Sequence, residues 1–182
     1  MDDHAGRFHI LTGGPGSGKT TLIEALGHRG FATTAEAGRT IIREQLSASG
    51  SALPWSNRQL FAERMLDFDM RNHMQARQCK GPVFFDRGIP DVLGYLELCG
   101  LAVSAYAEDA ARSYRYARRV FILPPWPEIF APDAERRQSF DEAERTYRAM
   151  VAVYSRLGYE LVEVPRAPVR ERADFIFADT GS

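Results

Sequence analysis

The segment GGPGSGKT, residues 13–20, constrains the fold of this chain more than any other stretch. It fits the pattern G-x-x-x-x-G-K-[ST], in which glycines let backbone N–H groups converge on a di- or triphosphate. Strand-forming residues 8–12 precede it, and residues 21–26 carry apolar side chains at helical spacing. A strand, a glycine-rich turn and a helix in this order put an anion at a helix N-terminus. The context therefore predicts a nucleoside triphosphate site rather than an ordinary surface turn.

The pattern assigns a role to each residue of this loop. Lys19 would reach the β- and γ-phosphates, and the hydroxyl of Thr20 would bind Mg²⁺. The residues that we expect to bind the nucleotide are Gly13, Gly14, Pro15, Gly16, Ser17, Gly18, Lys19, Thr20 and Thr21.

Length and composition are those of a globular protein. The 182 residues suit one domain over 1–182, with 45% hydrophobic and 26% charged residues. The net charge of −1 gives no overall basic field for nucleic acid. No apolar run approaches the roughly 20 residues that span a bilayer, and we expect no signal peptide in the first residues, which lack an apolar segment. With only Cys79 and Cys99, expected to be buried thiols, we predict a cytoplasmic protein without a membrane or nucleic-acid partner.

Short apolar segments alternate with helical patterns along the chain. Such an alternation predicts an α/β fold with a parallel sheet covered by helices on both faces. Ligands of these sheets bind beyond the carboxyl ends of the strands. The expected strands are 7–12, 31–34, 82–86, 119–123 and 160–164, and the main expected helices are 37–47, 57–79, 92–99, 105–117 and 140–157.

Asp86 ends the third expected strand, in the sequence VFFDRG at residues 83–88. An acid at the tip of an apolar strand near a phosphate loop is the usual second partner of Mg²⁺. The alternative is that Asp86 caps the next helix, but Asp91 is better placed for that role. We therefore expect Thr20 and Asp86 to hold the metal.

The residue after this acid separates two kinds of chemistry. Mechanical ATPases normally carry a glutamate there to activate water, whereas this chain has Arg87. A guanidinium cannot act as a base, but its planar group binds a phosphate or a substrate hydroxyl well. Arg87 thus favours phosphoryl transfer to a small acceptor over ATP hydrolysis.

Together these motifs resemble the nucleoside and nucleotide kinase group of P-loop proteins. The string FFDRGIPDVLGY, residues 84–95, is more similar to the predicted AAA ATPase/kinase family that includes ribosylnicotinamide kinase domains of the NadR type. The resemblance runs from the first strand to VPRAPVRERADFI at residues 164–176. It implies a P-loop NTPase with five parallel strands in the order 2-3-1-4-5, a short lid, and ATP with Mg²⁺ as the donor. The acceptor stays open.

Kinases of this group close an arginine-bearing lid over the phosphates, which excludes water and stabilises charge. Arg136 and Arg137, in a segment of about 124–142, lie where such a lid would fall. The alternative is a solvated helix with pairs such as Arg137–Asp141. By analogy the adenine would rest near Arg166, and Trp126 would anchor the hinge of the lid.

The acceptor side is predicted from the residues after the second strand. In similar kinases an acid at the position of Glu36 binds or deprotonates the acceptor hydroxyl. Arg39 would share a helix face with it, although a structural salt bridge is a serious alternative. The expected acceptor residues are Glu36, Arg39, Arg64 and Arg87. Arg64 is otherwise a solvated charge, Phe61 is more readily explained as core, and Trp55 is placed to close over an acceptor ring.

The resulting hypothesis is a kinase that transfers the γ-phosphoryl group of ATP to a nucleoside-like or other small hydroxyl acceptor. Its catalytic residues would be Lys19, Glu36, Asp86, Arg87, Arg136 and Arg137. The alternative is a nucleotide-dependent switch that binds a protein partner, although no guanine-reading N-K-x-D is present. A ring-forming mechanical ATPase is the weakest alternative, because the glutamate after Asp86 is missing. A monomer or homodimer is expected.

Overall fold

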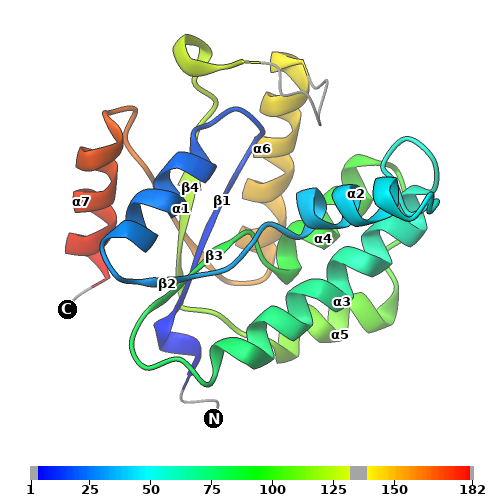
Figure 1. Cartoon of the computed structure of the whole chain (residues 1–182), viewed down its shortest axis with the longest axis horizontal. Helices are drawn as coiled ribbons and strands as arrows, with labels where there is room; N and C mark the ends of the chain where they lie inside the picture. The colour runs from blue at the N-terminus through cyan, green and yellow to red at the C-terminus, as the bar shows by residue number, and fades with distance from the viewer. Residues whose placement is uncertain (1–3, 132–138, 181–182) are drawn as a thin grey trace.

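A computed structural model of the chain describes residues 4–131 and 139–180. These residues form a parallel five-stranded sheet in the order β2-β3-β1-β4-β5 (Figure 1). This is the predicted order, and it places β1 between β3 and β4. The strands are β1 (Phe8–Gly13), β2 (Ala32–Thr33), β3 (Val83–Asp86), β4 (Arg119–Leu123) and β5 (Glu160–Glu163).

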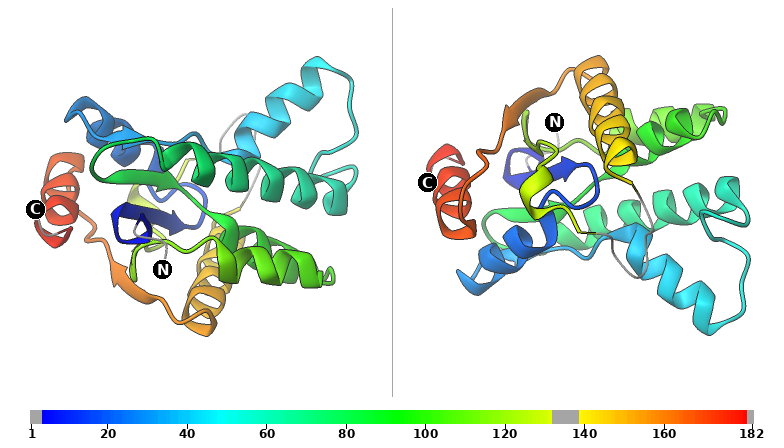
Figure 2. Two further views of the ribbon diagram at one scale, coloured as in Figure 1. Left: turned by 90° about the horizontal axis from the view of Figure 1, so that it is seen from below. Right: turned by 90° about the horizontal axis from the view of Figure 1, so that it is seen from above.

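Helices connect the strands and cover both faces of the sheet, as each buried parallel strand requires. One apolar cluster joins β1, β3 and β4 to α3, α4, α5 and α6, and another joins the opposite face to α1 and α7 (Figure 2). The helices are α1 (Lys19–His28), α2 (Ala37–Ser47), α3 (Arg58–Ala76), α4 (Ile89–Leu98), α5 (Ala105–Ser113), α6 (Phe140–Arg156) and α7 (Val169–Asp179).

A third apolar cluster lies apart from the sheet, between α2 and α3. It contains Ile41 and Ile42 of α2 together with Phe61 of α3. In Figure 2, α2 and the beginning of α3 extend away from the sheet, whereas the later part of α3 packs against it. They therefore form a wall beyond the ends of the strands, where ligands of parallel sheets bind.

Several element boundaries differ from the prediction, and in each case a backbone hydrogen bond explains the difference. β2 begins after Phe31, because the Phe31 N–H bonds back to Leu26 O at 3.3 Å. The expected helix 57–79 ends at Ala76, since the next amides bond three residues back. The expected helix 105–117 ends at Ser113, because the Ala117 N–H turns to Phe8 O of β1 at 2.8 Å.

The starts of α3 and α4 are explained by residues in their first turns. Asn57 caps α3, its side chain accepting a hydrogen bond from Leu60 N at 3.0 Å. α4 begins at Ile89, earlier than the expected residue 92, with Pro90 tolerated in its first turn.

Cys79 and Cys99 are free thiols, half-buried rather than buried. No described helix is both long and apolar enough to cross a membrane.

Candidate active site

The glycine-rich loop joins β1 to the N-terminus of α1. Gly18 has φ +78°, a left-handed conformation that favours glycine, and it precedes the first helical residue, Lys19. Gly14 lies so close to α6 that a Cβ there would stand 2.3 Å from Ala143 O. The loop therefore requires glycine at these positions, for backbone conformation at one and for space at the other.

Lys19 and Asp86 meet where β1 and β3 end. Leu11 pairs with Asp86 in the parallel ladder, which aligns the tip of β3 with the start of the loop. Lys19 Nζ lies 3.9 Å from Asp86 Oδ1, and both side chains are buried. Thr20, the next residue, is exposed at the start of α1. A carboxylate and a hydroxyl are oxygen ligands of the kind that Mg²⁺ prefers.

Arg87 connects two buried acids on neighbouring elements. Its Nε lies 3.4 Å from Glu36 Oε1, and its Nη1 lies 3.0 Å from Asp91 Oδ1. Burial by itself would lower the pKa of Arg87, but Glu36, Asp91 and Asp86 together raise that pKa above its ordinary value. Arg87 therefore stays charged in a largely buried position.

Glu36 is held at the N-terminus of α2. It is the N-cap residue of this helix and is buried, with Arg39 Nε at 3.2 Å from Oε2 on one side and Arg87 on the other. Both arginines are those that the sequence analysis grouped with it. Arg39 forms a salt bridge with Glu36, which is the structural role considered as the alternative to acceptor binding. Arg39 does not line the cavity described below.

Asp91 does more than cap α4. Its Oδ2 accepts a hydrogen bond from Gly88 N at 3.0 Å, which is the expected cap. The same carboxylate also accepts hydrogen bonds from Thr12 Oγ1 of β1 at 2.6 Å and from Tyr154 Oη of α6. Through these contacts Asp91 connects the guanidinium of Arg87 to side chains of β1 and α6. The cap was visible in the sequence, whereas the two distant hydroxyls carried no local signal.

A cavity of about 900 Å³ opens beside Glu36 and Arg87. Its walls come from α2, α3, α4 and α6 and from the loop between α2 and α3. Phe61 is both core and cavity wall, because it packs in the α2–α3 cluster, contacts Tyr95 and faces the cavity. Trp55 lies at the cavity with 59% of its surface exposed.

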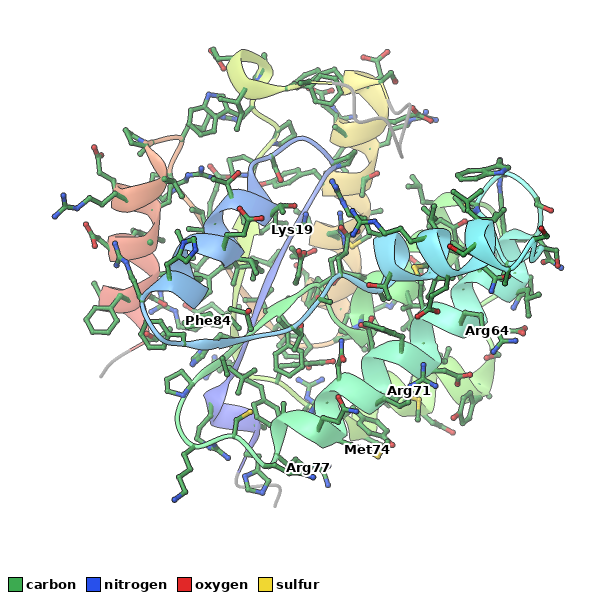
Figure 3. All side chains as sticks on the ribbon, in the orientation of Figure 1. Lys19, Arg64, Arg71, Met74, Arg77 and Phe84 are labelled. Carbon is green, nitrogen blue, oxygen red and sulfur yellow. The ribbon has the colours of Figure 1, made fainter. Side chains whose placement is uncertain are left out.

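Arg64, expected on the acceptor side, and Arg166, expected near the adenine, do not line this cavity. Arg64 is exposed on the outer side of α3, along with Arg71, and does not line the cavity (Figure 3). Arg166 donates from Nε and Nη2 to Pro125 O, at 3.0 and 2.9 Å, which joins the loop after β5 to the loop after β4. Trp126 lies near the guanidinium of Arg172, whose Nη1 donates to Gly18 O at 3.2 Å.

The proposed lid arginines, Arg136 and Arg137, lie outside the described residues. The described residues on either side pack over the loop: Phe130 and Phe140 form an edge-on pair with ring centroids 5.4 Å apart. A Cβ on Gly16 would stand 2.5 Å from the Phe130 ring. The segment that follows β4 therefore returns across the glycine-rich loop.

Asp69 was not predicted as a site residue. It lies on α3, is 4% exposed, and lines the cavity together with Glu36, Arg87 and Asp91. No motif surrounds it in the sequence. The only local signal is a carboxylate at a position that faces the core of an otherwise amphipathic helix.

The family model of an AAA domain matches residues 8–172, which include the loop, Asp86 and the cavity walls. The chain belongs to this family. No curated protein matches the chain in sequence.

Solved structures share the fold. NadR protein in complex with NR has a TM-score of 0.79 at 16% identity, with 98% of this chain and 53% of NadR covered. Deoxyadenosine kinase from M. mycoides has a TM-score of 0.65 at 14% identity, covering 94% and 97% of the two chains. Shikimate kinase from Acinetobacter baumannii, in complex with shikimate, has a TM-score of 0.54 at 16% identity, covering 94% and 90%. The chain spans about half the length of NadR, and its fold is that of small-molecule kinases.

Proposed function

We propose that this protein transfers the γ-phosphoryl group of ATP, with Mg²⁺, to a hydroxyl group of a small molecule. The observation that carries the proposal is the contact between Glu36 and Arg87, 3.4 Å apart, which borders the cavity. The same sheet edge holds Lys19 and Asp86. A base and a cation beside a phosphate loop are the parts that phosphoryl transfer requires.

The residues present fit a nucleotide and its metal. The loop leaves no space for side chains at Gly14 and Gly16, so its backbone can approach phosphates closely. Thr20 and Asp86 would hold Mg²⁺, which in such sites keeps several waters and uses few protein ligands. When bound, the metal neutralises charge on the phosphates. Arg166 and the loop after β5 are proposed to border the adenine.

In this proposal Glu36 orients the acceptor hydroxyl and accepts its proton. Glu36 is buried, so the reacting oxygen would sit in a site from which bulk water is largely excluded. Lys19 and Arg87 would stabilise the negative charge on the transferring group. Arg136 and Arg137 are proposed to add to this charge from the lid, on the strength of the sequence alone.

The direct test is to incubate the purified protein with ATP, Mg²⁺ and panels of nucleosides, sugars and cyclic alcohols, and to detect products by mass spectrometry. A phosphorylated acceptor, lost in Lys19→Ala, is the expected result. Steady ATP hydrolysis with no phosphorylated compound in any class would contradict the proposal and favour a nucleotide-dependent switch. We also propose that the protein acts in the cytoplasm as a monomer or homodimer.

A further inference from the structure

The carboxyl group of Asp69 is buried at the cavity without a partner. Within residues 4–131 and 139–180, it takes part in no hydrogen bond and no ion pair, although only 4% of the residue is exposed. A buried polar group is normally satisfied by protein or by ordered water, and a bound ligand can take the place of such water. Because Asp69 lines the cavity, a ligand in that cavity is the partner within its reach.

The surroundings of Asp69 determine which chemistry it offers. Burial raises its pKa well above the ordinary value, and the carboxylates of Asp91, Glu36 and Asp86 raise it further against the opposing effect of Arg87. Burial and the neighbouring acids therefore favour the protonated form of this carboxyl group. A neutral carboxyl group can both donate a hydrogen bond and accept one, which matches an alcohol.

The rest of the cavity is lined mainly by apolar side chains. They come from three helices: Ile42, Leu46, Phe61, Met65, Val92 and Tyr95. Two of the polar side chains in the lining are engaged within the protein: Thr146 Oγ1 donates to Glu142 O at 2.8 Å, and Arg58 Nε donates to Pro54 O at 3.1 Å. Arg145 of α6 also lines the cavity. A nucleobase placed there would lose water from its polar edges, whereas a hydrocarbon ring would lose nothing.

We propose that the acceptor is an amphipathic diol: one hydroxyl group meets Glu36 and Arg87, a second meets Asp69, and an apolar ring packs among Phe61, Met65 and Tyr95. This inference rests on the proposed kinase function, because it takes the cavity as the acceptor site. In this cavity the charged side chains of Glu36, Asp69 and Arg87 accompany a mainly apolar lining. Such a lining is typical of ligand pockets, in which a few polar groups fix the orientation of the ligand. Trp55, exposed at the cavity, would cover the ring.

Two probes that share ribose but differ in the attached ring measure how much an apolar ring contributes to binding. Phenyl β-D-ribofuranoside carries an apolar ring on ribose, and cytidine carries a polar base on the same ribose. Binding of each is measured by calorimetry without ATP, and phosphorylation is measured with ATP and Mg²⁺. We expect the phenyl riboside to bind at least about tenfold more tightly. Equal or tighter binding of cytidine, or binding of neither probe, would overturn the inference.

Variants of Asp69 test the second contact. Asp69→Ala should weaken binding of the phenyl riboside about tenfold, whereas Asp69→Asn, which also donates and accepts, should stay within about threefold of the parent. Asp67→Ala, an exposed acid on the same helix, is the matched control and should change nothing. An equal loss in Asp69→Asn and Asp69→Ala would mean that a negative charge is required, and would overturn the diol in favour of a cationic ligand.

The two proposals fail in different ways. The inference is decided by the binding preference and by the Asp69 variants, which are read without ATP. The kinase function is decided by the phosphorylated product and its loss in Lys19→Ala. Phosphorylation of cytidine in preference to the phenyl riboside would leave the kinase standing and overturn the diol. Affinity of each variant for an ATP analogue and its melting temperature would show whether the fold is intact.

Discussion

At the scale of single residues, Arg87 combines a rare backbone conformation with a position between two acids of the candidate site. Its φ of +70° is rare for a residue with a side chain and costs about 1–3 kcal/mol. Its N–H bonds to Leu11 O at 3.0 Å, and its guanidinium spans Glu36 and Asp91. These contacts hold the strained conformation and keep the guanidinium between the two acids at the site.

We predict that Arg87→Lys lowers kcat/KM and that Arg87→Ala lowers it further, by about 100-fold, because the donor to the developing charge is lost. Lysine keeps the charge but cannot bridge two carboxylates with separate N–H groups. Steady-state kinetics on the identified acceptor would measure this. Arg64→Lys and Arg64→Ala are the controls, since Arg64 is exposed outside the cavity. Unchanged kcat/KM in Arg87→Ala would remove Arg87 from the reaction.

At the scale of elements, the sequence predicted those strands and helices best whose bounds depend on residues close together in the chain. Continuous apolar runs predicted β1, β3 and β4 well, because both faces of these strands are buried. β2 is shorter than predicted, since Phe31 completes the end of α1 instead. The predicted end of α3 was wrong because the amides after Ala76 bond three residues back, and the predicted end of α5 was wrong because the Ala117 N–H bonds to Phe8 O of β1.

The close approach of the glycine-rich loop to α6 is also a testable property of elements. Gly14→Ala should weaken binding of an ATP analogue and lower the free energy of unfolding by about 1–3 kcal/mol, because the new Cβ would collide with Ala143 O. Calorimetry and urea unfolding would measure the two effects. Gly6→Ala, where no atom lies within 4 Å of the new Cβ, should change neither. Parent-like affinity and stability in Gly14→Ala would contradict this packing.

The cap of α3 supports the helix that carries Phe61 and Asp69. Asn57→Ala removes the hydrogen bond from Leu60 N and should lower the free energy of unfolding by about 1 kcal/mol, as measured in urea. Asn57→Ser, which can still cap, should recover most of this loss. If serine and alanine proved equal, the side-chain cap would not contribute.

At the scale of the whole molecule, the cavity exists only because four helices converge beyond one edge of the sheet. Glu36, Asp69 and Asp91 are far apart in sequence and meet there with Arg87. Such a concentration of acids is unfavourable for folding unless protons or cations compensate for it. The stability of the whole protein should therefore depend on pH through this cluster.

Asp69 provides the clearest pH dependence. An unfolded aspartate titrates near a pKa of about 3.9, and burial raises the native pKa of Asp69. Between those two values the native state binds more protons than the unfolded state, so this contribution to stability falls as pH rises. Other charged groups that act on it are Asp91, Glu36, Asp86 and Arg87.

Asp69→Asn removes this titration, so its free energy of unfolding should exceed that of the parent by an amount that grows as pH rises above about 4, until the pH passes the raised native pKa. The gain should reach about 1.4 kcal/mol for each unit by which the native pKa is raised. Urea unfolding of both proteins across this range would measure it. Asp67→Asn, the exposed control, should give a constant difference, and the same constancy in Asp69→Asn would show that Asp69 ionises normally.

The amino-acid sequence by itself predicted the triphosphate loop and the position of Asp86 at the end of a strand near that loop, and the family resemblance implied the strand order. These follow from signals within a few residues of each other and from the rule that parallel strands end together. Only the tertiary structure decided the acceptor side. Asp91 reaches Thr12 and Tyr154 across 79 and 63 residues, and Asp69 reaches the cavity through the packing of α3. Contacts over such separations depend on how helices pack, which no local pattern encodes.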